Sequence, residues 1–149
     1  MLKMKFEKKL LKGTLVKRYK RFFADITLED GSLVTAHCPN TGRMTTCGTP
    51  GDTVFIQPND NPKRKLKITW ELTKTKGGYI GVNTVRPNHI VFEGLENGLI
   101  KELKGYDKHL KEKKYGNNSR IDILLEKEGG QSCYVEVKNT TLLQDGNLV

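Results

Sequence analysis

Two carboxylates and an ammonium group interrupt apolar segments near the end of this chain: Asp122, Glu136 and Lys138. Two facing carboxylates repel one another unless a cation lies between them. Mg²⁺ accepts one or two carboxylates together with waters and phosphate oxygens, and Mn²⁺ could substitute for it. A lysine close to such ligands can stabilise a phosphate or help to position an attacking water. These residue types predict metal-assisted hydrolysis of a phosphodiester, with Asp122 and Glu136 as metal ligands and Lys138 in support.

The hypothesis depends on the turn that joins the two strands carrying these residues. Side chains alternate across a strand, so Glu136 and Lys138 share one face. A three-residue loop, Glu128-Gly129-Gly130, would place Asp122 opposite Glu136, and glycine suits the left-handed backbone that such loops use. A two-residue Gly-Gly turn would instead pair Asp122 with Val137 and separate the carboxylates. The competing interpretation is a hairpin whose charged face is simply solvated.

A helical segment is expected just before these strands, because its apolar residues recur at helical spacing. They are Leu95, Leu99, Ile100 and Leu103. Asn97-Gly98 predicts a break into two short helices, and Gly105 is a plausible C-terminal cap. Near residues 82–87 the sequence changes from short strands and turns to helical spacing, which predicts a domain boundary there.

The first half of the chain reads as short strands separated by turns, with Asp30-Gly31 as a hairpin signal. Five short strands without a long helix predict a small OB-like β-barrel, a closed architecture that leaves few exposed edges. The chain as a whole is therefore expected to be α+β. The predicted strands cover residues 14–28, 33–38, 53–57, 66–75 and 79–85.

Cations and aromatic residues are interleaved in the first predicted strand. OB-folds bind single strands by stacking bases on strand aromatics while Lys and Arg follow the phosphates. In the alternative interpretation the aromatics belong to the core and the charges are solvated, and Trp70 is expected in the core. The nucleic-acid-binding candidates are Lys17, Arg18, Tyr19, Lys20, Arg21, Phe22, Asn40, Arg43, Lys63, Arg64 and Lys65.

Composition narrows the class of protein. Of 149 residues, 26 are Lys or Arg and 17 are Asp or Glu, and a net charge of +9 favours polyanionic partners. The basic start has no apolar signal-peptide core and no apolar run is long enough to span a bilayer, so a cytoplasmic location and no membrane partner are expected. Three cysteines without a CxxC pair indicate neither a disulfide framework nor a zinc site. No phosphate-binding glycine loop or nucleophilic triad is evident.

Several long blocks of this sequence closely resemble the sugar fermentation stimulation protein A family, from about Thr14 to Leu142. They are LVKRYKRFFADI, HCPNTGRM, PGDTV, KRKLKITWELT, KYGNNSRIDILL and CYVEVKNTTL. The resemblance implies an N-terminal OB-like domain over residues 1–84 and a restriction-endonuclease-like domain of the PD-(D/E)xK type over residues 85–149. It also implies DNA binding, with a suspected part in regulating sugar metabolism such as maltose use.

The family pattern assigns roles at three positions and suggests one more. Asp122 corresponds to the pattern's aspartate, and Glu136 to Lys138 correspond to its (D/E)xK element. An acidic residue from a preceding helix is often a further metal ligand, and Glu102 is the best match. Family members continue well past this element, whereas the present chain ends at Val149. We therefore expect either a truncated form or completion by another chain, which could be a second copy.

Three hypotheses follow from the sequence. The leading one is a DNA-binding protein without sequence specificity that carries a Mg²⁺-dependent nuclease centre. The alternative is a DNA-binding regulator of transcription that uses the nuclease fold without turnover. A third, a binder of acidic protein or anionic lipid, predicts no retention of nucleic acid at moderate salt.

Overall fold

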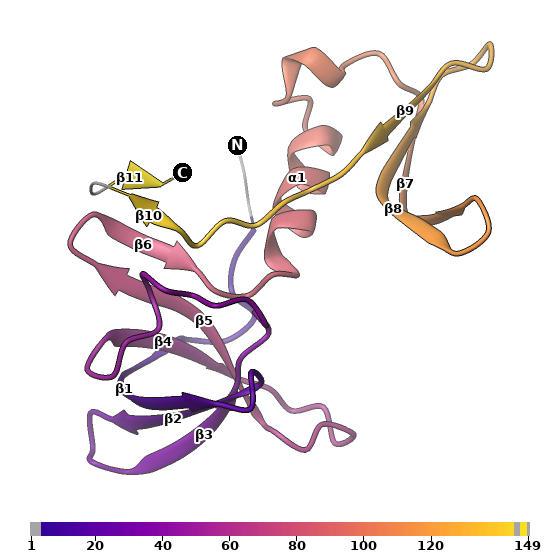
Figure 1. The fold of residues 1–149 in the computed structure, drawn as a ribbon. Coiled ribbons are helices and arrows are strands. Elements are labelled where there is room, and N and C mark those ends of the chain that lie inside the picture. The colour runs from indigo at the N-terminus through magenta and orange to yellow at the C-terminus, as the bar shows by residue number, and fades with distance from the viewer. Residues whose placement is uncertain (1–3, 145–146, 149) are drawn as a thin grey trace. The chain divides into compact units, whose positions relative to one another are not determined.

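The computed structural model describes residues 4–144 and 147–148 (Figure 1). The chain forms two compact units, each with its own hydrophobic core. One unit contains Phe6–Thr84 together with the described residues from Asn139 onward, and the other consists mainly of Val85–Lys138. The division between Thr84 and Val85 lies within residues 82–87, where the sequence pattern predicted a domain boundary. No helix in the described part of the chain is long and apolar enough to cross a membrane.

The first unit is a closed barrel, which confirms the predicted OB-like fold. Its strand order is β3-β2-β1-β4-β5-β6, and a parallel pairing of His37 in β3 with Thr69 in β5 closes the sheet. The strands are β1 (Leu11–Tyr19), β2 (Phe23–Leu28), β3 (Leu33–His37), β4 (Thr53–Pro58), β5 (Ile68–Thr75) and β6 (Gly78–Gly81).

The prediction of one continuous strand over residues 14–28 was wrong. A tight turn separates β1 from β2, and Tyr19 pairs directly with Phe23 across it. Lys20 and Arg21 have φ values of 48° and 63°. Glycine or asparagine normally occupies such left-handed positions, so two basic residues there gave no turn signal.

The barrel interior is filled by side chains that alternate inward along the strands. Trp70 is fully buried, as predicted, and its indole N–H donates to the Leu72 carbonyl at 3.1 Å. Gly13 allows β1 and β2 to approach closely, because a Cβ there would lie 2.5 Å from Cγ2 of Ile26. The largest fully buried aliphatic residues of this core are Leu15, Ile26, Val54, Ile56 and Val82.

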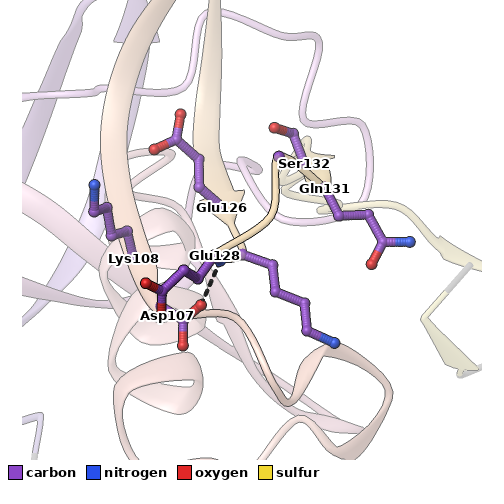
Figure 2. Close-up of a pocket in the computed structure, with 8 residues that line it drawn as sticks. Asp107, Lys108, Glu126, Glu128, Gln131 and Ser132 are labelled. Carbon is purple, nitrogen blue, oxygen red and sulfur yellow. Dashed lines mark hydrogen bonds between the residues drawn. The ribbon is translucent and has the colours of Figure 1, made fainter.

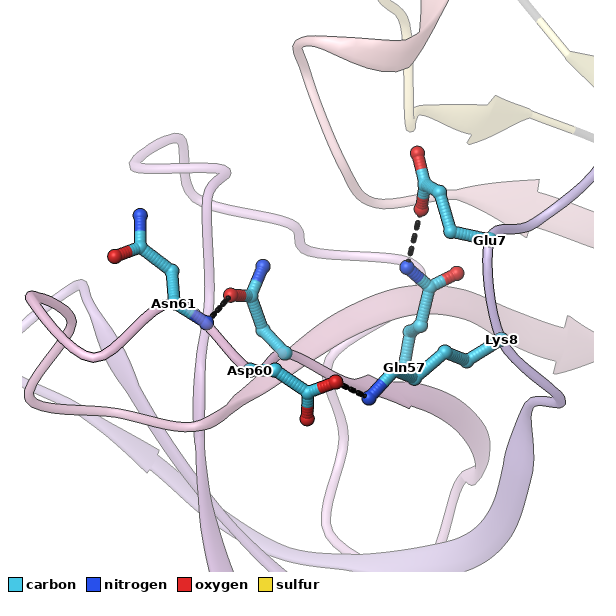
Figure 3. A network of polar contacts seen from close by, with 6 residues as sticks. Glu7, Lys8, Gln57, Asp60 and Asn61 are labelled. Carbon is cyan, nitrogen blue, oxygen red and sulfur yellow. Dashed lines mark hydrogen bonds and ion pairs between the residues drawn. The ribbon is translucent and has the colours of Figure 1, made fainter.

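The loop between β4 and β5 is held at its start by polar contacts (Figure 3). The Lys8 ammonium pairs with the Asp60 carboxylate, and the Gln57 amide donates to Glu7. The backbone N–H of Asn61 donates to the Asn59 side chain at 2.8 Å. These contacts fix the base of the loop that carries residues 63–65.

The segment after Asn139 packs with the barrel. The Thr46 hydroxyl donates to the Thr141 carbonyl and accepts the backbone N–H of Leu143, each at 2.9 Å. The Leu143 side chain packs against the barrel core. Two short strands, β10 (Leu143–Gln144) and β11 (Asn147–Leu148), pair with one another in this segment.

The second unit combines a helix with a three-stranded antiparallel sheet of order β7-β8-β9. Leu95 of the helix is buried with Ile123 and Leu125 of the sheet. Asn97 caps the helix and Gly98 has a φ of 61°, so the break predicted there is confirmed. The elements are α1 (Arg86–Glu96), the 3₁₀ helix η1 (Lys101–Leu103), β7 (Lys108–Tyr115), β8 (Ser119–Glu126) and β9 (Ser132–Val135).

Candidate metal centre and nucleic-acid interface

The turn between β8 and β9 has the odd length that the metal-site hypothesis requires. The backbone N–H of Lys127 donates to the Gln131 carbonyl at 2.8 Å, which closes a three-residue loop. Gly129 and Gly130 in that loop have φ values of 104° and 92°. The Asp107 carboxylate accepts the Glu128 backbone N–H at 2.6 Å and so anchors the turn (Figure 2). The predicted hairpin loop is confirmed.

This turn sets the register of the two strands. Leu124 pairs with Tyr134, and Ile123 with Val135. The next position therefore places Asp122 opposite Glu136, on the sheet face shared with Leu124 and Tyr134. The two carboxylates are brought to neighbouring positions on one face.

The Asp122 carboxylate is held by two hydrogen bonds. Its Oδ2 accepts the backbone N–H of Val137 at 2.7 Å, and its Oδ1 accepts the Asn88 side-chain amide at 3.0 Å. Asn88 lies in the first turn of α1, so helix and hairpin both fix this side chain. Sequence reasoning missed Asn88. The signal available was its position directly after Pro87 at the start of a helix.

Glu136 and Lys138 follow the end of β9 and are exposed. The Lys138 ammonium lies 2.5 Å from Oε1 of Glu136. The hydrogen bond and charge of Glu136, with a smaller contribution from Asp122, raise the pKa of Lys138 above its usual value. Lys138 is therefore a cation at neutral pH, suited to stabilise an anion rather than to accept a proton.

Glu102 belongs to a separate short helix. It is an exposed residue of η1, which follows the end of α1 at Glu96. Within the described residues, no group of three or more His, Cys, Asp or Glu is placed to hold a metal ion. A cavity of about 200 Å³ surrounds Asp122 instead, lined by Val85, Asn88, His89, Lys111, Glu112 and Ile123.

Two of the predicted nucleic-acid-binding residues of the barrel, Arg18 and Asn40, make hydrogen bonds within the protein. The Arg18 guanidinium donates to the backbone carbonyls of Asn40 at 2.7 Å and Gly42 at 2.8 Å, with longer contacts to those of Arg21 and Arg43. Arg18 therefore acts as a clamp on the loop after β3. Asn40 is buried and its side-chain oxygen accepts the Gly42 N–H at 2.8 Å, so it shapes the same loop.

The other nominated residues are exposed or lie at the surface. Tyr19 stacks on Phe23 with ring centroids 5.3 Å apart, and the Lys17 ammonium lies 5.2 Å from the Tyr19 ring. The Tyr19 hydroxyl and Lys17 also contact the Asp25 carboxylate. Exposed cations among the candidates are Lys17, Lys20, Arg21, Arg43, Lys63 and Lys65.

Residues 22–23, which follow the β1–β2 turn, and residues 64–66 of the β4–β5 loop line the same groove of the barrel. The groove has a volume of about 460 Å³ and is lined by Phe22, Phe23, His37, Arg64, Lys65 and Leu66. Arg64 donates to the Thr69 hydroxyl and to Nδ1 of His37, each at 3.1 Å. Burial, and then the positive charge of Arg64, lower the pKa of His37. Phe22 remains 48% exposed beside these cations.

Comparison with known proteins identifies the family. The N-terminal OB domain of the sugar fermentation stimulation protein matches residues 16–82, and the RE domain of the same protein matches residues 85–149. The chain belongs to the sugar fermentation stimulation protein family. The homologue from Geotalea uraniireducens is 56% identical over 140 residues, covering 94% of this chain and 60% of its own length. The homologue from Geobacter sulfurreducens is 53% identical over 137 residues, covering 92% and 58%. This member thus spans about 60% of the length of these curated relatives.

A solved structure has the same fold. It is described as Pyrococcus furiosus SfsA in complex with Ca²⁺, and it matches with a TM-score of 0.76 at 24% sequence identity. The match covers 91% of this chain and 56% of the Pyrococcus chain.

Proposed function

We propose that this protein binds DNA without sequence specificity through the barrel groove, and that Asp122 and Glu136 form a Mg²⁺-dependent phosphodiesterase centre. The observation that carries the proposal is the groove where Phe22 meets Arg64 and Lys65. A partly exposed aromatic ring beside two cations offers a stacking surface for a base and partners for phosphate. The net charge of +9 favours the same ligand class.

The residues at the second centre fit a hard divalent cation. The two Asp122 oxygens each accept one hydrogen bond, from a backbone N–H and an amide. Such bonds orient the carboxylate and leave further lone pairs for a cation. Asp122 and Glu136 would hold Mg²⁺, with waters and phosphate oxygens completing its shell. When bound, the cation would supply charge neutralisation and a more acidic water.

The protein's own groups would act on the phosphate around that cation. Lys138 is a fixed positive charge beside Glu136 and would bind a non-bridging phosphate oxygen. Asn88 would keep the Asp122 carboxylate in a single orientation. The similar Pyrococcus furiosus structure is described as a complex with Ca²⁺, which motivates testing a divalent cation here.

DNA binding is tested by titrating a fluorescent oligothymidylate at several salt concentrations. We expect Phe22→Ala to weaken affinity about tenfold to hundredfold, because a stacked base contributes about 1–3 kcal/mol. Lys65→Ala should reduce the salt slope by about 0.7. Lys76→Ala removes one exposed charge from the turn between β5 and β6 and is the matched control. An equal loss of affinity in Phe22→Ala, Lys65→Ala and Lys76→Ala would indicate diffuse attraction by charge. It would contradict binding at the groove.

Catalysis is tested with the same protein and a labelled oligonucleotide, with Mg²⁺ or with EDTA. We expect Glu136→Gln to abolish Mg²⁺-dependent cleavage while binding persists. Cleavage that survives this substitution would remove Glu136 from the mechanism. DNA binding without any cleavage in Mg²⁺ would favour the second candidate, a non-catalytic regulator of sugar-metabolism genes, since the barrel groove alone supports binding.

A further inference from the structure

We propose that two exposed tyrosines of the second unit, Tyr115 and Tyr134, form a contact surface for single-stranded nucleic acid. The cations that accompany the pair are Lys113, Lys114 and Arg120. The inference rests on the ligand class proposed above. It requires neither the barrel groove nor the metal centre, because all of these side chains belong to the other unit and none of them is a proposed metal ligand.

The two tyrosine rings pack against one another at the protein surface. Tyr115 is the last residue of β7 and Tyr134 lies in β9, and their ring centroids are 5.7 Å apart with the planes tilted by 57°. The residues are 46% and 57% exposed. Among the described residues, the side chains that form the core of this unit do not include either ring. The pair therefore leaves aromatic surface in contact with water, where a ligand can stack on it.

Cations lie next to this pair in both strands of the β7–β8 hairpin. Lys113 and Lys114 directly precede Tyr115, and the register pairs Lys114 with Arg120 of β8. All three cations are exposed. Like charges directly opposite one another on neighbouring strands are destabilising. A bound phosphate between Lys114 and Arg120 would relieve this repulsion, so the arrangement favours an anionic ligand.

The carboxylates near the pair are already matched by cations. Glu112 forms a long ion pair with Arg120 at 3.9 Å, and both side chains are exposed. Glu136, two residues after Tyr134, is paired with Lys138. An exposed pair as long as that of Glu112 holds its partner weakly. Arg120 can therefore leave Glu112 for a phosphate at little cost.

The combination of ring surface and cations fits an unpaired strand better than a duplex. Single strands bind where bases stack on aromatic side chains and Lys or Arg contact the phosphates. In a duplex the base faces are covered by neighbouring bases, and only the base edges are presented in the grooves. Because the Tyr115 and Tyr134 rings are tilted, one base would stack on one ring rather than insert between the two.

The first experiment titrates the full chain with a fluorescent oligothymidylate. We expect Tyr134→Ala to weaken binding at least about fivefold, which corresponds to the loss of one stacked base. Tyr134→Phe keeps the ring and should stay within about twofold of the wild type. The matched control is Tyr79→Ala in the barrel, since Tyr79 is 59% exposed and also packs against one aromatic ring, that of Phe55. It should bind as the wild type does.

The second experiment locates the bound strand. One thymidine is replaced by iododeoxyuridine, the complex is irradiated, and the cross-linked residues are mapped by mass spectrometry. We expect cross-links at Tyr115 or Tyr134 in addition to those in the barrel groove. Unlabelled single strand should remove the tyrosine cross-links at a lower concentration than duplex of the same length. Lys114→Gln should lower the salt slope of binding by about 0.7, whereas Lys127→Gln in the β8–β9 turn should leave it unchanged.

The outcomes separate this surface from the barrel groove. Binding within about twofold of the wild type in both Tyr115→Ala and Tyr134→Ala, with cross-links at Phe22 alone, would overturn the tyrosine surface and leave the groove standing. Equal competition by duplex for the tyrosine cross-links would overturn stacking on unpaired bases. If the wild type binds no oligonucleotide at all, the proposal of DNA binding fails and this inference fails with it.

Discussion

The replacement of Arg18 by methionine tests whether this residue stabilises the barrel or binds nucleic acid. The sequence placed Arg18 among the nucleic-acid contacts, but its guanidinium donates to carbonyls of the loop that follows β3. Methionine retains much of the aliphatic packing and removes every donor. The expected result is a less stable barrel whose groove residues are otherwise intact.

The magnitude follows from the contacts. Two short bonds from a charged donor, at 2.7 and 2.8 Å, contribute about 1.5 kcal/mol each at the low end of the usual range. Arg18 Nε is buried with no acceptor among the described residues, which costs about 1 kcal/mol that methionine would relieve. The net loss of unfolding free energy is therefore about 2 kcal/mol.

The assay is urea unfolding followed by Trp70 fluorescence, because this single tryptophan lies in the barrel core and reports on that unit alone. With a slope of about 1.5 kcal/mol per molar urea, the midpoint should fall by about 1.3 M. Arg43→Met is the control: this exposed residue of the same loop should change stability by less than about 0.5 kcal/mol. An Arg18→Met variant as stable as the wild type would refute the proposed stabilising role of Arg18.

Two further predictions concern the barrel. Because its pKa is lowered in the folded state, His37 binds fewer protons there than in the unfolded chain, and it should destabilise the barrel as pH falls below about 6.5. His37→Gln should flatten this dependence between pH 7.5 and 5.5, measured by Trp70 fluorescence, and an unchanged pH profile would contradict the assignment. Gly13→Ala should cost at least about 2 kcal/mol, because the added Cβ would lie 2.5 Å from Ile26 and 2.8 Å from the Thr27 carbonyl. If Gly13→Ala had the urea midpoint of the wild type, β1 and β2 would have to move apart at residue 13 without cost, which would contradict this prediction.

The parts of the site that the sequence predicted depend on local rules. Alternation along β8, together with an odd loop containing Gly129 and Gly130, was sufficient to predict the register in which Ile123 pairs with Val135 and Leu124 with Tyr134. The helix break at Asn97-Gly98 follows from the same kind of short-range signal. Both depend on residues within a few positions of one another.

The parts that the sequence missed depend on long-range contacts or on strained backbone. Asn88 reaches Asp122 across 34 positions of sequence, which no local pattern encodes. Arg18 resembles any other cation of a basic strand until the loop after β3 folds back over it. The turn at Lys20 and Arg21 uses left-handed backbone without glycine, so composition indicated a continuing strand.

The end of β9 links the architecture to the proposed chemistry. In an antiparallel ladder that closes at Lys127 and Gln131, alternation makes Ile121 and Val137 the next hydrogen-bonded pair beyond Ile123 and Val135. The Val137 N–H donates to the Asp122 carboxylate instead. Asp122 therefore takes the place of a backbone acceptor and ends the ladder at the position where Glu136 and Lys138 leave it. In the proposed centre, Asp122 would stay in place while Glu136 and Lys138, which lie beyond the end of the ladder, would adjust around a cation and a phosphate.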